Sequence, residues 1–245
     1  MNCCNAYESE SMREALGDTL RPGGFLLTEQ GVQYCKITVE DKVLDLGCGR
    51  GATVHYLLKS HGIRAVGIDP SEKLIQEAKE LYGDADFVLG RGEALPFGNS
   101  CFQCVFAECT LSLMDTDRTF RQVNRVLADG GWFVITDVYA KKPEAVGELD
   151  RFRFSVNSCM RGLHNLPLLR EKLEQAGFQI AYMEDTSYFL KELLVKTVFS
   201  CGSMSAFWSA ASEGCVNGCE FQESLKKCKP GYFILIGRKA GSGHG

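Results

Sequence analysis

The stretch that most constrains this chain is VLDLGCGRG, at residues 43–51. Its first four residues are mostly apolar and predict a buried strand, and three glycines follow at alternate positions. Val54, Leu57 and Leu58 then share one face of a predicted helix. A strand, a glycine turn and a helix in this order are typical of a pocket for a nucleotide-like ligand, because bare backbone and the unpaired N–H groups of a helix start both face it.

A second segment, at residues 65–69, ends in an acid that fits the same pocket. It reads AVGID and predicts the next strand. Asp69 lies 18 positions after Gly51, close to the spacing expected of an acid that holds a ribose diol. The turn reads G-x-G-x-G rather than G-x-G-x-x-G, which counts against a dinucleotide.

The segments VLDLGCGRG and VGIDPS together resemble the class I S-adenosylmethionine-dependent methyltransferases, of the small-molecule type that includes menaquinone and ubiquinone methyltransferases. The run RVLADGGWFVITDVY is similar to the family's RVLKPGG element. The resemblance covers roughly residues 40–140. It implies an α/β, Rossmann-like fold, with a seven-stranded, mostly parallel sheet in the order 3-2-1-4-5-7-6 and helices on both faces. It also implies S-adenosylmethionine as cofactor, with S-adenosylhomocysteine as its product.

The cofactor contacts implied by the resemblance lie where the strands end, and they are Asp45, Gly47, Cys48, Gly49, Asp69, Pro70, Gly92, Glu93 and Glu108. Asp69 is expected to take both ribose hydroxyls, and Glu108 to face the cofactor's ammonium group. After the third strand, the family carries an acid that accepts from the adenine amine, but Arg91 stands there and can only donate. We therefore expect the Gly92 N–H and Glu93 to contact adenine.

The sequence indicates the site of the methyl acceptor less clearly than the site of the cofactor. Methyl transfer is an in-line displacement at a sulfonium, so the protein mainly aligns donor and acceptor and excludes water. Transfer to carbon or oxygen of a small molecule, such as a quinone-like one, also needs a base, unless the acceptor is already acidic. His164, Glu108 and Tyr139 are the candidates, although each also fits a structural role.

The cysteines favour an alternative, soft acceptor. AECTLSLMD and ITDVYA are similar to segments of arsenite methyltransferases, and Cys159 lies where those enzymes carry a metalloid-binding cysteine. Cys35 precedes the first strand, as another of theirs does, and Cys201 or Cys215 would complete a trio. Thiolates suit a soft trivalent centre. This hypothesis predicts a metalloid or thiol methyltransferase.

Three further interpretations concern the cysteines and the activity. Late cysteines that allow a zinc or iron–sulfur site are Cys201, Cys215, Cys219 and Cys228. Their spacing lacks the usual C-x2-C pair, so we expect free thiols and no metal. Cys48, Cys101 and Cys104 fall in core or strand positions and predict reduced, mostly buried thiols. A non-catalytic protein that senses the cofactor or scaffolds a partner is the last alternative, against which the glycines and Asp69 argue.

Length and charge bound the remaining expectations. A chain of 245 residues suits a single domain, with an N-terminal lid over 1–40, a cofactor core over 41–139, and substrate-cap insertions over 140–164 and 188–229. The formal net charge of -4 and the lack of a basic block give no support to nucleic-acid binding. No apolar run is long enough to span a membrane, and the first residues lack a secretion signal. We therefore expect a cytoplasmic protein that acts on a small molecule.

Apolar periodicity predicts the other elements of the sheet. Strands are expected over 85–90, 104–109, 132–138, 178–186 and 231–239, and helices over 26–36, 116–127 and 166–177. The Asp129-Gly130-Gly131 segment is expected to end the second of these helices. A further helix is expected before the turn at 21–24.

Overall fold

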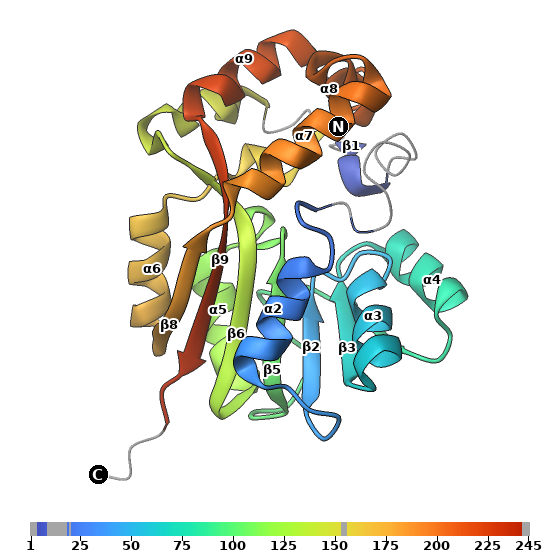
Figure 1. Ribbon diagram of the computed structural model, residues 1–245, viewed down its shortest axis with the longest axis vertical. Coiled ribbons are helices and arrows are strands. Elements are labelled where there is room, and N and C mark those ends of the chain that lie inside the picture. The colour runs from blue at the N-terminus through green and yellow to red at the C-terminus, as the bar shows by residue number, and fades with distance from the viewer. Residues whose placement is uncertain (1–3, 9–18, 20, 153–155, 242–245) are drawn as a thin grey trace.

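The structure is a computed structural model that describes residues 4–8, 19, 21–152 and 156–241. At its centre is a seven-stranded sheet in the order β4-β3-β2-β5-β6-β9-β8 (Figure 1). Its strands are β2 (Lys42–Leu46), β3 (Arg64–Asp69), β4 (Asp86–Leu89), β5 (Phe102–Glu108), β6 (Leu127–Ala140), β8 (Phe178–Asp185) and β9 (Pro230–Lys239). Strands β2 to β6 pair in parallel, while β9 runs antiparallel to β6 and β8. This order confirms the predicted fold.

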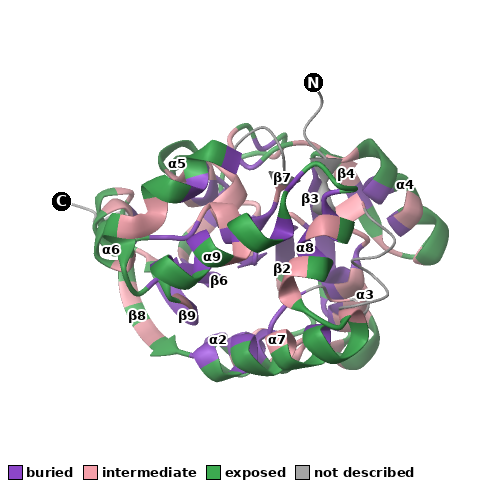
Figure 2. Cartoon of the chain, turned by 90° about the horizontal axis from the view of Figure 1, so that it is seen from above, coloured by how far each residue is buried: buried purple, intermediate pink, exposed green. Residues whose placement is uncertain are grey.

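Helices cover both faces of the sheet. The first face carries α2 (Leu26–Cys35), α3 (Ala52–His61) and α4 (Glu72–Leu81), and the second carries α5 (Thr116–Val126) and α6 (Leu166–Gln175). Because side chains alternate along a strand, β5 sends Phe106 toward Val32 of α2 and Val105 toward Phe120 of α5. Seen from above, buried strands lie between helices whose outer faces are exposed (Figure 2).

A helical cap lies over the carboxyl ends of the strands (Figure 1). It consists of α7 (Ser187–Cys201), α8 (Met204–Ala211) and α9 (Gly218–Cys228), with the short helical turns η3 (Pro143–Phe152) and η4 (Cys159–Arg161) beside them. The sequence predicted insertions here but not these helices. Polar N-caps start two of them, since the side chains of Ser203 and Asn217 accept from the N–H groups of Ala206 and Cys219.

The described part of the N-terminus reaches across the strand ends. β1 (Cys4–Asn5) pairs in parallel with β7 (Val156–Asn157), and the turn η1 (Ala6–Glu8) follows. The Ser71 hydroxyl donates to Glu8 Oε1 over 2.8 Å, just before α4. This segment therefore contacts both the cap side and the core. The helix expected before residue 21 falls mainly outside the described residues.

One predicted boundary is wrong. The strand expected at 132–138 already begins at Leu127, directly after α5, and pairs there with Phe102. Leu127 is extended, with a φ of -72° and a ψ of 138°, so the chain turns into the sheet at once. Gly130, with a φ of 72°, therefore bends the strand instead of ending the helix.

Candidate active site

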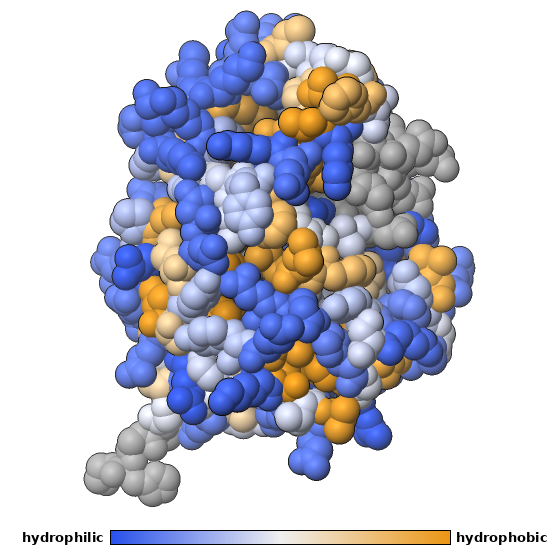
Figure 3. All heavy atoms as spheres, in the orientation of Figure 1, coloured by the Kyte–Doolittle hydropathy of each residue, from blue (hydrophilic) through white to orange (hydrophobic). Residues whose placement is uncertain are grey.

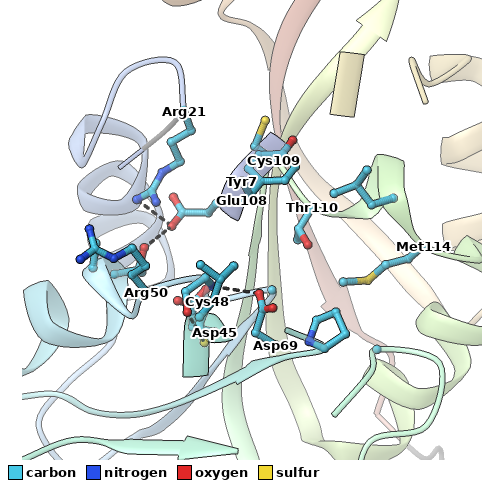
Figure 4. A pocket seen from close by; sticks show the side chains of 18 of the residues that line it. Tyr7, Arg21, Asp45, Cys48, Arg50, Asp69, Glu108, Cys109, Thr110 and Met114 are labelled. Atoms are coloured by element: carbon cyan, nitrogen blue, oxygen red, sulfur yellow. Dashed lines mark hydrogen bonds and ion pairs between the residues drawn. The ribbon is translucent and has the colours of Figure 1, made fainter. Parts of the chain in front are cut away.

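The carboxyl ends of β2, β3 and β5 open onto a pocket of about 210 Å³ (Figure 4). All nine cofactor contacts expected from the sequence line it: Asp45, Gly47, Cys48, Gly49, Asp69, Pro70, Gly92, Glu93 and Glu108. Parallel α/β sheets bind their ligands at this edge. We call this space the cofactor pocket.

The glycine turn forms one wall of the cofactor pocket. Gly47 has a φ of 79°, and a Cβ built there would lie 2.0 Å from Thr110 Oγ1. Gly49 has a φ of 53°, and a Cβ there would meet no protein atom within 4 Å. Gly47 is thus required by the fold itself, whereas Gly49 leaves backbone open to a ligand.

Asp69 ends β3 and is almost fully buried. Its Oδ2 accepts from the Gly49 N–H over 2.9 Å, and its Oδ1 accepts from the Ser71 N–H over 2.9 Å. Burial raises the pKa of Asp69, and these two N–H donors act against that shift. The carboxylate is therefore held in one orientation at the point where the glycine turn meets α4.

A buried ion pair forms the floor of the cofactor pocket. Arg21 Nη2 lies 2.9 Å from Glu108 Oε2 and donates to Thr28 Oγ1 over 2.8 Å. The Thr28 hydroxyl donates to Glu108 Oε1 over 2.8 Å, and the Thr53 hydroxyl to Glu108 Oε2 over 3.1 Å. Figure 4 shows Arg21 and Glu108 facing one another. From the sequence, Arg21 was interpreted only as part of a turn, so its ion pair with Glu108 was not predicted.

Asp45 also lines the cofactor pocket, and its side chain is buried. Burial, together with the nearby Glu108 carboxylate, raises the pKa of Asp45 to about 8, while Arg21 acts in the opposite direction. Asp45, Asp69 and Glu108 bring three carboxyl groups to the cofactor pocket, whose lining also includes Arg21, Arg50 and Arg91. A positively charged ligand group close to Asp45 would favour the ionised form of this carboxyl.

The rim of the cofactor pocket holds the residues expected near adenine. Glu93 Oε1 accepts from the Asp115 N–H over 3.0 Å, which fixes its carboxylate at the rim. A Cβ on Gly92 would lie 2.8 Å from Met114 Sδ, so the backbone is tightly packed there. Arg91 also lines the pocket and is exposed. These positions agree with the expected roles, which remain predictions.

A second, smaller cavity of about 50 Å³ adjoins the cofactor pocket, and we call it the cap cavity. Tyr7 and Cys109 line both spaces. The other walls are mainly apolar and come from the cap, β6 and η4: Pro22, Val138, Ser158, Cys159, Met160, Leu190, Leu193, Leu194, Thr197, Met204, Phe207 and Trp208. Tyr7 and Cys109 therefore form a partition between the two spaces.

Cys109, one of the two residues of this partition, has an unusual backbone conformation. It follows β5 directly, with a φ of 60°, which non-glycine residues rarely adopt outside functional or strained sites. Its Sγ lies 3.3 Å from Cys159 Sγ, and the Cys159 N–H donates to the Tyr7 hydroxyl over 2.9 Å. The bond to Cys159 and burial raise the pKa of Cys109 well above its usual range. Sequence reasoning missed Tyr7 and Cys109.

Of the candidates for catalysis, Glu108 lines the cofactor pocket and Cys159 lines the cap cavity, whereas His164 and Tyr139 line neither space. His164 Nε2 lies 3.3 Å from Asp137 Oδ2, and Asp137 in turn accepts from the N–H and hydroxyl of Ser112. The Tyr139 hydroxyl donates to Asp185 Oδ2 over 2.8 Å, and burial raises the pKa of Tyr139. His164 and Tyr139 thus hold loops together next to the site.

The proposed trio of Cys35, Cys159 and a late cysteine is wrong. The Cys35 thiol is hydrogen-bonded to Cys104, near the start of β5, whereas Cys159 contacts Cys109 beyond its other end. Five residues of strand separate the two pairs by about 16 Å at 3.3 Å per residue. No cluster of three or more metal-type ligands occurs among the described residues. Cys35 packs beside a core thiol instead.

The remaining cysteines of the described chain differ in exposure. Cys215 and Cys219 are exposed, whereas the buried Cys228 thiol donates to the Ser224 carbonyl over 3.4 Å. Cys48 and Cys104 are buried, as expected, and Cys101 is half-buried. Within the described residues, no helix is both long and apolar enough to cross a membrane.

Comparison with known proteins supports the resemblance of this chain to methyltransferases. Residues 44–135 match the family model described as "Methyltransferase domain". O-methyltransferase resE of Aspergillus sclerotiorum is 30% identical over 154 residues, which cover 58% of this chain and 56% of that protein. Phosphoethanolamine N-methyltransferase 3 of Arabidopsis thaliana is 29% identical over 179 residues, covering 70% and 36% respectively. The chain therefore spans between about a third and a little over half of these two relatives.

Solved structures share the fold at low identity. Phosphoethanolamine N-methyltransferase 2 of Haemonchus contortus, solved in complex with S-adenosyl-L-methionine, has a TM-score of 0.74 at 19% identity and covers 94% of this chain and 56% of that one. The [4+2]-cyclase SpnF has a TM-score of 0.71 at 20% identity and covers 99% of each chain. Residues 44–135 thus match a methyltransferase domain, and the sheet order and the glycine–acid pocket are those expected of class I S-adenosylmethionine-dependent methyltransferases.

Proposed function

We propose that this protein transfers a methyl group from S-adenosylmethionine to a small molecule. The observation that carries the proposal is the partition of Tyr7 and Cys109, which lies between a cofactor-type pocket and a mainly apolar cavity. A donor on one side and an acceptor on the other would meet at this partition. The relatives named above act on different acceptors by their names, so they support a small molecule without choosing one.

The cofactor pocket has donors and acceptors that fit each part of S-adenosylmethionine. Asp69 would accept from the ribose hydroxyls, and the open backbone at Gly49 would lie against the methionine part. Glu108 would take the ammonium, while Arg21, already beside it, would take the carboxylate. An ion pair aligned with a zwitterion in this way satisfies both charges without a large rearrangement.

The chain's own contribution to the reaction is alignment. S-adenosylmethionine supplies a methyl group on a sulfonium, whose leaving group needs no proton. The Arg21–Glu108 pair and Asp69 would fix the two ends of the donor, and the cap would exclude water from the acceptor side. Tyr7 and Cys109 would limit the approach to the line between the two spaces.

Two measurements on the purified protein test this proposal. Calorimetry with S-adenosylhomocysteine measures whether the pocket binds the cofactor, and a screen against small-molecule pools measures whether S-adenosylmethionine is consumed. We expect binding together with turnover on some member of the pools. Binding without turnover would favour the non-catalytic alternative, or a role like that of the cyclase that shares the fold. Absence of binding would reject both.

A further inference from the structure

The described walls of the cap cavity carry no group suited to remove a proton or to form an ion pair. Among the described residues that line it, the titratable groups are Tyr7, Cys109 and Cys159, and none is a carboxylate, an imidazole or an amine. The hydroxyls on its walls are engaged with backbone. Thr197 Oγ1 donates to the Leu193 carbonyl over 2.8 Å, and Ser158 Oγ accepts from the Met160 N–H.

The groups at the partition are held in their protonated forms. Burial raises the pKa of Tyr7, and the bond to Cys159 raises the pKa of Cys109. A thiol or phenol in its neutral form is a poor base. Outside the wall, His164 is bonded to Asp137, and Glu108 is paired with Arg21, so these two groups already have partners within the protein.

The size and lining of the cap cavity limit what enters it. A cavity needs about 10–15 Å³ to hold one water, so about 50 Å³ accepts only a few non-hydrogen atoms. Burying a charge without a partner is costly, so the entering group should be neutral. Four sulfur-containing residues line the cavity and bring polarisable side chains to it: Cys109, Cys159, Met160 and Met204.

We propose that the acceptor is a small, uncharged thioether or selenoether, an inference that rests on the proposed function. Its lone pair forms the new bond to the methyl carbon while the carbon–sulfonium bond of S-adenosylmethionine breaks. The electron pair of the broken bond stays on the cofactor sulfur, and the positive charge passes to the acceptor as a sulfonium or selenonium. No proton moves and no electron is gained or lost overall.

A thioether or selenoether is favoured over a phenol or an amine because it is uncharged and has no proton to lose before it reacts. A phenol, with a pKa of about 10, must first lose a proton, and an alkyl amine, also near 10, enters as a cation. The cap cavity offers no group among the described residues to handle either case. A thioether is neutral and carries its reacting lone pair already exposed.

The aromatic wall suits the product of this reaction. Tyr7, Phe207 and Trp208 line the cap cavity, and Trp208 is anchored by its Nε1–H, which donates to Gln222 Oε1 over 2.9 Å. Aromatic faces attract cations such as a developing sulfonium. Trp208 therefore acts in this proposal as a positioning residue that favours the onium-forming transition state.

The test uses the full chain with saturating S-adenosylmethionine and four probes: dimethyl selenide, tetrahydrothiophene, phenol and trimethylamine. Mass spectrometry measures the methylated products, and S-adenosylhomocysteine release measures turnover. We expect trimethylselenonium and S-methyltetrahydrothiophenium, with a kcat that stays constant from about pH 6 to about pH 9, because a thioether or selenoether loses no proton in the reaction. Methylation of phenol with a rate that rises with pH, and unreacted selenide, would overturn the proposal.

Other outcomes separate this inference from the proposed function. If both chalcogen ethers stay unreacted while the small-molecule pools give turnover, the acceptor class is wrong and the methyl transfer stands. If the cofactor binds and no compound reacts, the acceptor class and the methyl transfer are both rejected. If S-adenosylhomocysteine does not bind, the cofactor assignment falls with them.

Variants of Trp208 test the aromatic wall. Trp208→Leu should lower kcat/KM for dimethyl selenide by about tenfold through the lost cation–π attraction, and Trp208→Phe should restore most of it. Trp132→Leu is a matched control, since Trp132 lies on β6 against Arg238 and lines neither space. Affinity for S-adenosylhomocysteine should be unchanged in all three. Equal losses in Trp208→Leu and Trp208→Phe would show that the aromatic face has no such role.

Discussion

At the scale of single residues, Asp45 makes the cofactor pocket sensitive to pH. Its carboxyl pKa is raised to about 8, so the free protein holds this group largely protonated at neutral pH. For a raised carboxyl pKa, the contribution to stability is fully present below the unfolded value, near 4, and is lost as pH rises through about 8. We expect Asp45→Asn to flatten the pH dependence of unfolding across that range, as measured by denaturant titration.

The same residue predicts a proton linked to cofactor binding. A cofactor that brings positive charge to the floor favours the ionised form of Asp45, so binding near pH 7 should release a proton. Calorimetry in buffers of different ionisation enthalpy measures this release. Affinity should rise between about pH 6 and about pH 9, and Asp45→Asn should remove the rise. A proton release that persists in the variant would assign it to another group.

Asp69 tests the ribose contact. Removing a charged hydrogen-bond partner costs about 1.5–3 kcal/mol, so Asp69→Ala should weaken S-adenosylhomocysteine binding by at least about tenfold. Asp86→Ala is a matched control, because Asp86 is an exposed acid at the start of β4. Calorimetry on both variants makes the comparison. Equal affinities in the two variants would remove Asp69 from the cofactor contacts.

At the scale of elements, α7 presents two different faces. Leu190, Leu193 and Leu194 line the cap cavity, whereas Val195 and Phe199 are exposed. Apolar surface appears between hydrophilic side chains near α7 and α8 in Figure 3. One face of the helix therefore shapes the cap cavity, and the other contributes little to the core.

This division predicts unequal effects of substitutions in α7. Leu190→Ala removes a buried side chain, so it should cost about 2–5 kcal/mol of unfolding free energy and change the KM for the acceptor. Its cofactor affinity should be unchanged, since Leu190 does not line the cofactor pocket. Phe199→Ser should change stability by less than about 0.5 kcal/mol, because the side chain is 87% exposed. Similar losses in both variants would contradict the assignment of the two faces.

The elements also show what the sequence could and could not predict. The turn at Gly47 and the acid at Asp69 were found because local spacing alone fixes them in a strand–turn–helix unit. Arg21, Tyr7 and Cys109 were missed because their partners are distant in sequence: Arg21 meets Glu108, and Cys109 meets Cys159. Only tertiary packing brings such pairs together. The cap helix α7 was missed because it is apolar on both faces, which hides the helical period.

At the scale of the whole molecule, core and cap have separate tasks. Loops after the core strands supply the cofactor pocket, and α7, α8 and η4 supply most of the cap cavity. Tyr7 and Cys109 form the boundary that both spaces share. Changes in the cap should therefore alter acceptor kinetics, while changes at the strand ends should alter cofactor affinity.

The central claim, methyl transfer from S-adenosylmethionine, is tested most directly with a cofactor labelled in its methyl group. The protein is incubated with methyl-deuterated S-adenosylmethionine and small-molecule pools, and mass spectrometry counts labelled products and S-adenosylhomocysteine. We predict one labelled methyl group in product for each S-adenosylhomocysteine formed, with Asp69→Ala slower at low cofactor concentration. Cofactor binding with no S-adenosylhomocysteine and no labelled product from any pool would contradict the claim.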